Sequence, residues 1–347
     1  MRINFKKVTA LLTCLMSVCL LQHSVSAADV SLGDGTEDET FMEYDAQTGE
    51  ITYFTLSDIL EKERQRAVDG KESKVQEVIE PDGTRYILPS GPIVPSVSAS
   101  KNEMSAGDEP RTVFTDNPST LVSNVYAQPY CKTVLVVVKF QKPNGQFEYC
   151  SGSGAMVGNK VLLTAAHVIY NVHYSPALTP YEIRVFQRVN TTKNSEESMF
   201  NESGYFHPHS WVISSNYLPD VNANYDWCYL TMWDDIGYTY TGYYGIATNS
   251  NSNDKRNVHI NGYPAVAGKS YHQYTSSGVM RSESLYRVKH RCSMESGQSG
   301  APLYNDSYVV WAINTHHAPS WDTGHNRGTR ITQALYTLLI NKINETN

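Results

Sequence analysis

The chain has 347 residues, of which 40% are hydrophobic and 18% are charged, and its formal net charge at pH 7 is −7. These values indicate a globular protein with one large or two ordinary domains. The acidic balance comes without any basic stripe, which excludes a surface organised for nucleic-acid binding, and no nucleic-acid partner is expected.

Residues 1–27 have the pattern of a cleaved signal peptide. Basic residues between Arg2 and Lys7 precede an apolar run from Val8 to Leu21, and the small-x-small sequence Val25-Ser26-Ala27 follows. A membrane anchor is the alternative, but about 14 apolar-rich residues fall short of the ~20 that span a bilayer. We therefore expect a secreted protein with no stable membrane insertion once the signal is removed.

Residues 28–101 are distinguished by their charge, with 16 acidic and 7 basic residues. A charged, helix-favouring stretch runs from Asp58 to Glu80, and a Pro/Ser-rich stretch follows from Pro89 to Ser100. This composition predicts a pro-segment and an exposed linker. The alternative is a flexible tail with no regulatory role. Activating cuts are expected after Lys101 or Arg111.

The remaining residues, 102–347, are nearly neutral and are expected to form the functional domain as a monomer. A hairpin is predicted from Val134–Phe140 and Phe147–Val157, because a Gly-containing turn separates two β-branched or aromatic runs. Further strands are expected at 160–163, 182–186, 227–232, 258–262, 276–281, 286–292 and 308–314. This pattern is typical of an all-β barrel protein. Near the C-terminus, apolar residues at helical spacing between Ile331 and Ile343 predict a helix that packs on the barrel.

Four cysteines lie beyond the signal peptide, at Cys131, Cys150, Cys228 and Cys292. In an oxidising compartment we expect disulfide bonds, with three possible pairings that spacing alone does not separate. The chain has no Cys-x-x-Cys pair. His207-Pro208-His209 and His316-His317 lack the spacing of a metal-binding helix, so neither a metal site nor a cofactor is expected.

Three separated segments carry residues for nucleophilic catalysis. Leu163-Thr164-Ala165-Ala166-His167 comes first, Asp226 follows at the start of an apolar strand, and Gly297-Gln298-Ser299-Gly300 comes last. A serine hydroxyl is a poor nucleophile until an imidazole takes its proton, and a carboxylate is needed to orient that imidazole. We therefore expect His167, Asp226 and Ser299 to form a catalytic triad. Asp220 is the rival carboxylate, but it follows Leu218-Pro219 in a loop.

The same segment encodes donors for a developing oxyanion, because a glycine two residues before the serine permits a sharp turn. The N–H groups of Gly297 and Ser299 are expected to form this oxyanion hole. An α/β-hydrolase is excluded, because that fold places serine before aspartate and histidine, and only 48 residues follow Ser299. A catalytically silent binding or adhesion protein is the alternative from another functional class.

From about Arg111 to the C-terminus the chain resembles the bacterial glutamyl endopeptidases, a branch of the chymotrypsin-fold serine proteases. The resemblance rests on five segments besides the histidine motif: Tyr205-Phe206-His207-Pro208 with Trp211, Asn224-Tyr225-Asp226-Trp227, Ile260-Asn261-Gly262-Tyr263-Pro264, Gly297 to Tyr304, and Asn326 to Thr332. It implies two six-stranded antiparallel β-barrels with the site between them, a secreted zymogen, and hydrolysis of protein or peptide substrates through an acyl-enzyme.

The resemblance also implies substrate-binding positions, and here the chain departs from the family. A family histidine in the strand after the serine corresponds to Asn314, and a threonine five residues before the serine corresponds to Met294. Thr315 and His316 continue the same strand. A substrate glutamate would lose solvation in a pocket without a cation. Either His316 or His317 supplies the missing charge, or the pocket prefers an uncharged residue.

Overall fold

The structure, a computed structural model, describes most of the chain beyond the signal peptide. The described residues are 39–70, 73–90, 114–174, 177–191, 193, 195–218, 220–237, 242–249, 254–266, 268–269, 271–317, 322 and 324–346. The signal peptide and the expected activating cuts after Lys101 and Arg111 lie outside them.

The first barrel is built around the predicted hairpin, which the structure confirms as β6 (Thr133–Gln141) and β7 (Phe147–Met156). Six strands follow one another around it, in the order β10 (Pro208–Ser214), β11 (Cys228–Met232), β8 (Val161–Thr164), β7, β6 and β9 (Pro180–Gln187). An antiparallel bridge between Val185 and Phe206 closes the ring. Residues of β6 are buried on both faces because the run Val134 to Val138 is continuously apolar.

The second barrel is a ring of six antiparallel strands, in which every neighbouring pair is hydrogen-bonded. Its order is β13 (Lys255–Gly262), β14 (Tyr274–Ser282), β15 (Arg287–His290), β18 (Asn326–Arg330), β17 (Val309–His316) and β16 (Pro302–Tyr304), which pairs back to β13. The expectation of two six-stranded barrels is therefore confirmed. Two further strands pair outside the ring, β5 (Thr120–Leu121) with β14 and β12 (Gly245–Thr248) in parallel with β17.

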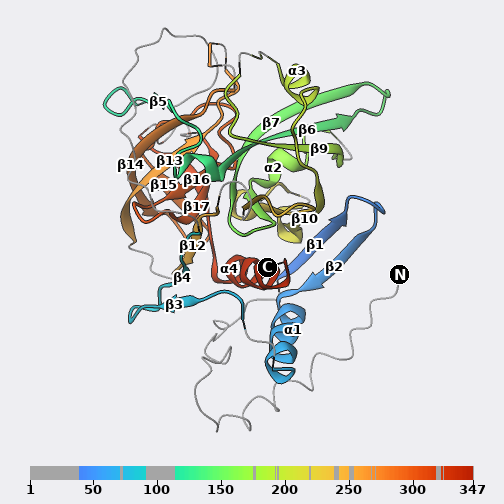
Figure 1. Cartoon of the computed structure of the whole chain (residues 1–347), viewed down its shortest axis with the longest axis vertical. Helices are drawn as coiled ribbons and strands as arrows, with labels where there is room; N and C mark the ends of the chain where they lie inside the picture. The colour runs from blue at the N-terminus through green and yellow to red at the C-terminus, as the bar shows by residue number, and fades with distance from the viewer. Residues whose placement is uncertain are drawn as a thin grey trace.

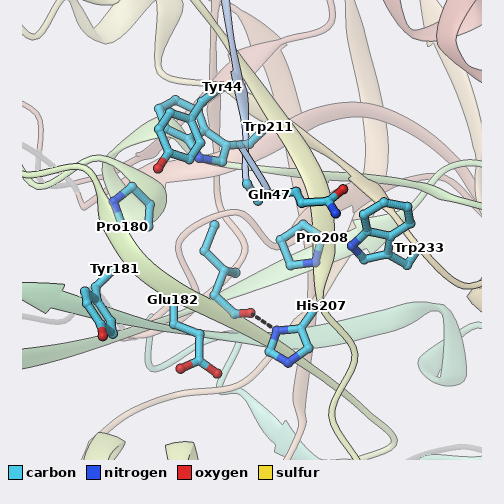
Figure 2. Close-up of a pocket in the computed structure, with 11 residues that line it drawn as sticks. Tyr44, Gln47, Pro180, Tyr181, Glu182, His207, Pro208, Trp211 and Trp233 are labelled. Atoms are coloured by element: carbon cyan, nitrogen blue, oxygen red, sulfur yellow. Dashed lines mark hydrogen bonds between the residues drawn. The ribbon is translucent and has the colours of Figure 1, made fainter. Parts of the chain in front are cut away.

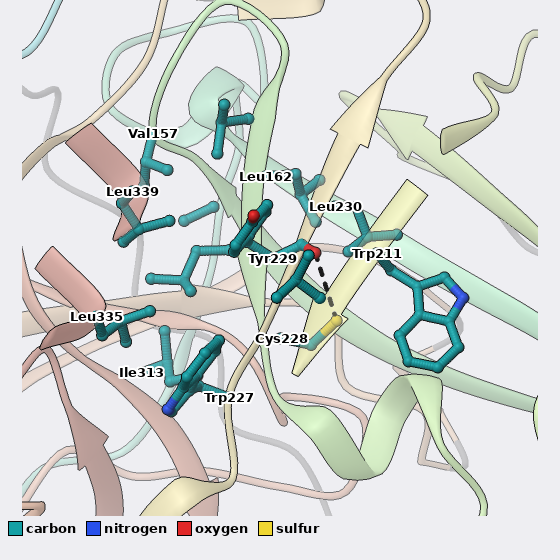
Figure 3. Packing of buried hydrophobic residues seen from close by; sticks show 14 of the residues in the cluster. Val157, Leu162, Trp211, Trp227, Cys228, Tyr229, Leu230, Ile313, Leu335 and Leu339 are labelled. Carbon is teal, nitrogen blue, oxygen red and sulfur yellow. Dashed lines mark hydrogen bonds between the residues drawn. The ribbon is translucent and has the colours of Figure 1, made fainter. Parts of the chain in front are cut away.

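The predicted C-terminal helix is α4 (Gln333–Thr346), and it packs between the barrels. Figure 3 shows Leu335 and Leu339 of this helix in one buried cluster with Trp227 of the first barrel and Ile313 of the second. Two short helices, α2 (Ala166–Ile169) and α3 (Glu196–Phe200), interrupt the first barrel. The shared cluster fixes how the barrels meet, since close-packed interiors tolerate little displacement.

The acidic N-terminal segment forms regular structure on the barrels (Figure 1). It contains β1 (Thr40–Asp45), β2 (Ile51–Thr55), α1 (Leu56–Val68), β3 (Glu77–Ile79) and β4 (Arg85–Ile87). Helix α1 begins with a capping box between Thr55 and Asp58, which satisfies its free amides. The predicted helical stretch was too long: the helix ends at Val68, and Glu77 already belongs to a strand.

The expected disulfide bonds are not found in the structure: Cys131, Cys150, Cys228 and Cys292 are all thiols that form no S–S bond. Cys228 lies in the shared core and Cys292 in the separate core of the second barrel, so the fold does not bring the two together. No helix among the described residues is long and apolar enough to cross a membrane.

Candidate active site

His167 and Asp226 meet because the strands that precede and follow them are paired. Strand β8 ends at Thr164, which is opposite Cys228 at the start of β11. His167 in α2 comes just after the end of β8, and Asp226 comes just before the start of β11. The two side chains therefore lie at the same edge of the first barrel.

The Asp226 carboxylate holds the histidine at two points. Nδ1 of His167 lies 2.7 Å from Oδ2 of Asp226, and the backbone N–H of His167 donates to Oδ1 at 3.0 Å. The carboxylate is fully buried, whereas the His167 side chain is 30% exposed. With the proton on Nδ1, the Nε2 lone pair is left to accept a proton from a substrate or a nucleophile.

The electrostatics of the pair follow from this contact. Burial by itself would raise the pKa of Asp226, but the charge and hydrogen bond of His167 outweigh it, and the pKa is lowered. Burial would likewise lower the pKa of His167, but the charge and hydrogen bond of Asp226 reverse the direction, and the pKa is raised. The pair thus favours the imidazolium that general-base catalysis creates.

Ser299 is held against the histidine segment by the two glycines that flank its turn. Gly297 and Gly300 have φ of +89° and +82°, a conformation that favours glycine. A Cβ on Gly300 would lie 2.2 Å from Oγ1 of Thr164 and 2.9 Å from the amide nitrogen of Ala165, two residues before His167. The carbonyl of Ser299 also accepts from the Ser153 N–H at 2.7 Å. The turn from Gly297 to Gly300, called the serine turn below, therefore packs closely against the end of β8 in the first barrel.

Ser299 is half-buried, and no hydrogen bond joins its hydroxyl to the His167 ring among the described residues. Catalytic hydrogen bonds are often long without substrate and tighten when it binds. The N–H groups of Gly297 and Ser299 have no acceptor within the described part of the chain. They are therefore available as donors to a substrate oxygen.

Asn314 braces the serine turn. Its Nδ2 donates to the carbonyl of Gln298 at 2.8 Å, and its backbone carbonyl accepts from the Gly300 N–H at 2.8 Å. Its Oδ1 lies 3.1 Å from Nε2 of His290, a buried ring that the sequence analysis missed. Burial lowers the pKa of His290 to about 4, so this ring is neutral at pH 7.

Of the other predicted substrate-binding positions, two are buried in the second barrel and one lies near His167 and Asp226. Met294 is buried in the core of the second barrel, and Thr315 is buried with its hydroxyl directed to the carbonyl of Arg327 at 3.5 Å. Among these positions, His316 reaches toward the His167–Asp226 pair: its Nδ1 lies 3.9 Å from Oδ2 of Asp226, and its ring centroid lies 5.8 Å from that of His167.

A buried ion pair beside the serine turn also escaped the sequence analysis. Lys269 forms a salt bridge to Glu295, whose side chain is 1% exposed. The side chain of Gln298 accepts from the backbone N–H of Glu295 at 2.8 Å, which joins the backbone of this residue to the serine turn. Lys269 and Glu295 are far apart in the sequence and neither lies in a motif, so no local pattern predicts their contact.

A pocket of about 380 Å³ lies elsewhere, between the β1–β2 hairpin and strands β9 and β10. Figure 2 shows Tyr44 and Gln47 of the N-terminal segment facing Tyr181, His207 and Trp233 across it. None of its lining residues is a predicted site residue, so this pocket does not mark the catalytic centre.

Comparison with known proteins gives a consistent picture. The glutamyl endopeptidase of Bacillus licheniformis is 28% identical over 241 residues, which make up 67% of this chain and 69% of that protein. The structure of a Glu endopeptidase in complex with MPD matches with a TM-score of 0.53 at 20% identity, covering 67% of this chain and 99% of that one. A thermostable serine protease AL20 from an extremophilic microorganism has a TM-score of 0.48 at 15% identity, covering 62% and 98%. No protein-family model matches the chain.

The double barrel, with a buried carboxylate on a histidine, has the chymotrypsin fold, in which the Glu endopeptidase structure is also built. In sequence the chain is similar to the glutamyl endopeptidase of Bacillus licheniformis, at 28% identity.

Proposed function

We propose that this protein hydrolyses peptide bonds with Ser299 as nucleophile, His167 as general base and Asp226 as the group that orients the imidazole. The observation that carries this is the double hydrogen bond from His167 to the buried Asp226, in a segment against which the Ser299 turn is pressed. In this proposal, three residues from distant parts of the chain act together between the barrels.

The reaction proceeds in two halves. Nε2 of His167 takes the Ser299 hydroxyl proton as Oγ attacks the substrate carbonyl, and the negative oxygen is stabilised by the Gly297 and Ser299 N–H groups. The C–N bond then breaks and the leaving amine takes the proton from His167. Water repeats the sequence on the acyl-enzyme, which releases the acid and restores the serine.

We place an uncharged side chain, rather than glutamate, before the scissile bond. Asn314 stands where a histidine is expected in the family, and its amide is already engaged by Gln298 and His290. Burial lowers the pKa of His316 to about 4, so this ring carries no charge at neutral pH. Lys269 is neutralised by Glu295. A substrate carboxylate would lose its hydration without gaining a cation in return.

The remaining features describe how the enzyme is made. A signal peptide at 1–27 directs secretion, residues 28–101 form the pro-segment and linker of a zymogen, and residues 102–347 form the protease domain, which acts as a monomer on proteins or peptides. The apolar run and small-x-small site support the signal, and the acidic composition supports the pro-segment.

Labelling with a fluorophosphonate probe tests the proposed nucleophile. The processed protein should label at one site, and Ser299→Ala should abolish labelling together with peptide hydrolysis. Ser307→Ala, at an exposed turn between β16 and β17, is the matched control and should label like the wild type. Absence of labelling in the folded wild-type protein would favour the catalytically silent binding protein instead.

A further inference from the structure

The N-terminal segment, residues 39–90, extends the first barrel by strand addition. Strand β1 pairs antiparallel with β10 from Phe41 opposite Ser214 to Asp45 opposite Ser210, and β2 pairs with the outer edge of β1. Strand β10 would otherwise present unpaired amides and carbonyls on this side. An added strand is held by main-chain hydrogen bonds, and its side chains enter pockets on the acceptor sheet.

Aromatic side chains of the added strand complete the core. Phe41 is fully buried, and its ring centroid lies 5.9 Å from that of Trp227, the residue after Asp226. Tyr44 stacks on the buried Trp211 of β10 at 5.2 Å. Without the segment, Trp211 and Trp227 would each lose an aromatic neighbour, and Trp227 directly follows the candidate catalytic carboxylate in the chain.

Polar contacts satisfy groups that the first barrel buries. The hydroxyl of Ser214 donates to Oε1 of Glu39 at 3.0 Å, and the hydroxyl of Ser210 donates to Oε1 of Glu43 at 2.9 Å. Both serines are buried. Buried polar groups left without partners are costly, so these bonds favour the bound segment.

A second attachment lies on the other barrel, where β4 pairs with β12. A Cβ on Gly245 would lie 2.2 Å from the Ile87 carbonyl, which shows how closely the backbones approach. Nζ of Lys132, in a side chain that is 1% exposed, donates to the carbonyls of Ser90 at 2.7 Å and Tyr243 at 2.9 Å. Removal of the segment would take one of these acceptors from a buried ammonium group.

A third attachment joins the segment to the C-terminal helix, beside which α1 lies in Figure 1. Oδ1 of Asn344 accepts from the backbone N–H groups of Lys74 at 2.9 Å and Val75 at 3.1 Å, and Arg66 lies 3.5 Å from Glu345. In contrast, no hydrogen bond or ion pair joins described residues of 39–90 to His167 or Ser299.

We propose that residues 39–90 stay bound after the chain is cut behind them, so that the active enzyme is a two-chain protein with this segment as a permanent structural part. The three attachments lie on both barrels and on α4, and none plugs the candidate site. This inference rests on the proposed processing between the two parts, but its test uses Ser299→Ala and therefore does not depend on catalysis.

The experiment inserts the recognition sequence of a site-specific protease after Lys101 in the Ser299→Ala chain. After cutting, size-exclusion chromatography without denaturant should give one peak that contains both fragments in equal amounts, and the fragments should separate in urea. Elution of residues 28–101 apart from a still folded remainder would overturn the inference.

A matched pair of substitutions localises the contact. Phe41→Asp, in the buried position on Trp227, should weaken retention of the cut fragment at least tenfold, whereas Tyr53→Asp, 64% exposed on β2, should leave it unchanged. Equal retention in the two variants would contradict the role of β1.

Hydrogen exchange on the cut protein needs no core substitution and remains informative should Phe41→Asp fail to fold. The amides of β10 should keep their protection within about threefold of the uncut chain. Protection that falls to the level of a free strand edge would show that the segment has left.

Discussion

Nδ1 of His316 lies 3.9 Å from Oδ2 of Asp226, the oxygen that also contacts Nδ1 of His167. Two imidazoles thus face one buried carboxylate. They differ in how readily they take a proton, because burial lowers the pKa of His316 to about 4, whereas the pKa of His167 is raised by Asp226 against the effect of burial. His316 is therefore a neutral ring beside the pair that we propose moves the proton.

Replacing His316 should affect substrate binding more than chemistry. We expect His316→Ala to raise KM for a peptide about fivefold, equivalent to about 1 kcal/mol, and to change kcat less than threefold. Steady-state kinetics on a peptide series measure both constants. A large loss of kcat at unchanged KM would instead indicate that His316 orients Asp226.

The pH profile should report His167. The base must be neutral to accept a proton, so kcat/KM should fall as the pH drops through the raised pKa of His167. Asp226→Asn removes the charge that raises this pKa, so the acid limb should move to lower pH while kcat falls on the order of 10³ to 10⁴. An acid limb that moves upward in this variant would contradict the assignment.

Specificity can be redirected at the two positions that depart from the family. Wild-type enzyme should cleave after glutamine faster than after glutamate at pH 7.5. The double variant Asn314→His with Met294→Thr should raise the glutamate-to-glutamine ratio of kcat/KM by about tenfold, or about 1.4 kcal/mol. Asn257→His, exposed on β13, is the control and should leave the ratio unchanged. A wild-type preference for glutamate would refute the uncharged pocket.

Glu39 should make the stability of the N-terminal attachment depend on pH. Burial raises its pKa to about 7, against the hydrogen bond from Ser214. Between the unfolded value of about 4.5 and 7, the folded state binds more protons, so stability falls as pH rises through this window and is level above it.

Substitution of Glu39 isolates this effect. In the Ser299→Ala background, Glu39→Gln should remove up to about 3 kcal/mol of the stability loss between pH 4.5 and 8, measured by urea unfolding. Glu50→Gln, exposed in the β1–β2 turn, should keep the wild-type dependence. Parallel curves for Glu39→Gln and wild type would exclude Glu39 as the source.

The thiols provide a prediction for covalent chemistry. Because none of the four cysteines beyond the signal peptide forms a disulfide bond in the structure, guanidinium-unfolded mature protein should take up iodoacetamide at every one of them without reductant. Before unfolding, labelling should be slow, since burial raises the thiol pKa values, that of Cys150 to about 11. A mass that shows missing adducts, restored by reductant, would reveal a disulfide.

Several elements of this protein, and its candidate catalytic residues, could be predicted from local sequence patterns. The hairpin of β6 and β7 was predictable because an Asn-Gly turn separates two β-forming runs, and α4 was predictable from its helical spacing of apolar residues. The chain order of His167, Asp226 and Ser299 indicated the chemistry before any fold was known, because each lies in a short motif whose residue types the reaction requires.

Contacts between residues that are distant in the sequence could be seen only in the tertiary structure. The pairing of β1 with β10 joins residues about 170 positions apart and adds part of the expected pro-segment to the sheet of the first barrel. The engagement of Asn314 by His290, the burial of Lys132 and the separation of the cysteines depend in the same way on which strands become neighbours. A sequence pattern indicates which face of a helix or strand is apolar. Which strands pair, and which side chains make contact, depends on packing across the whole chain.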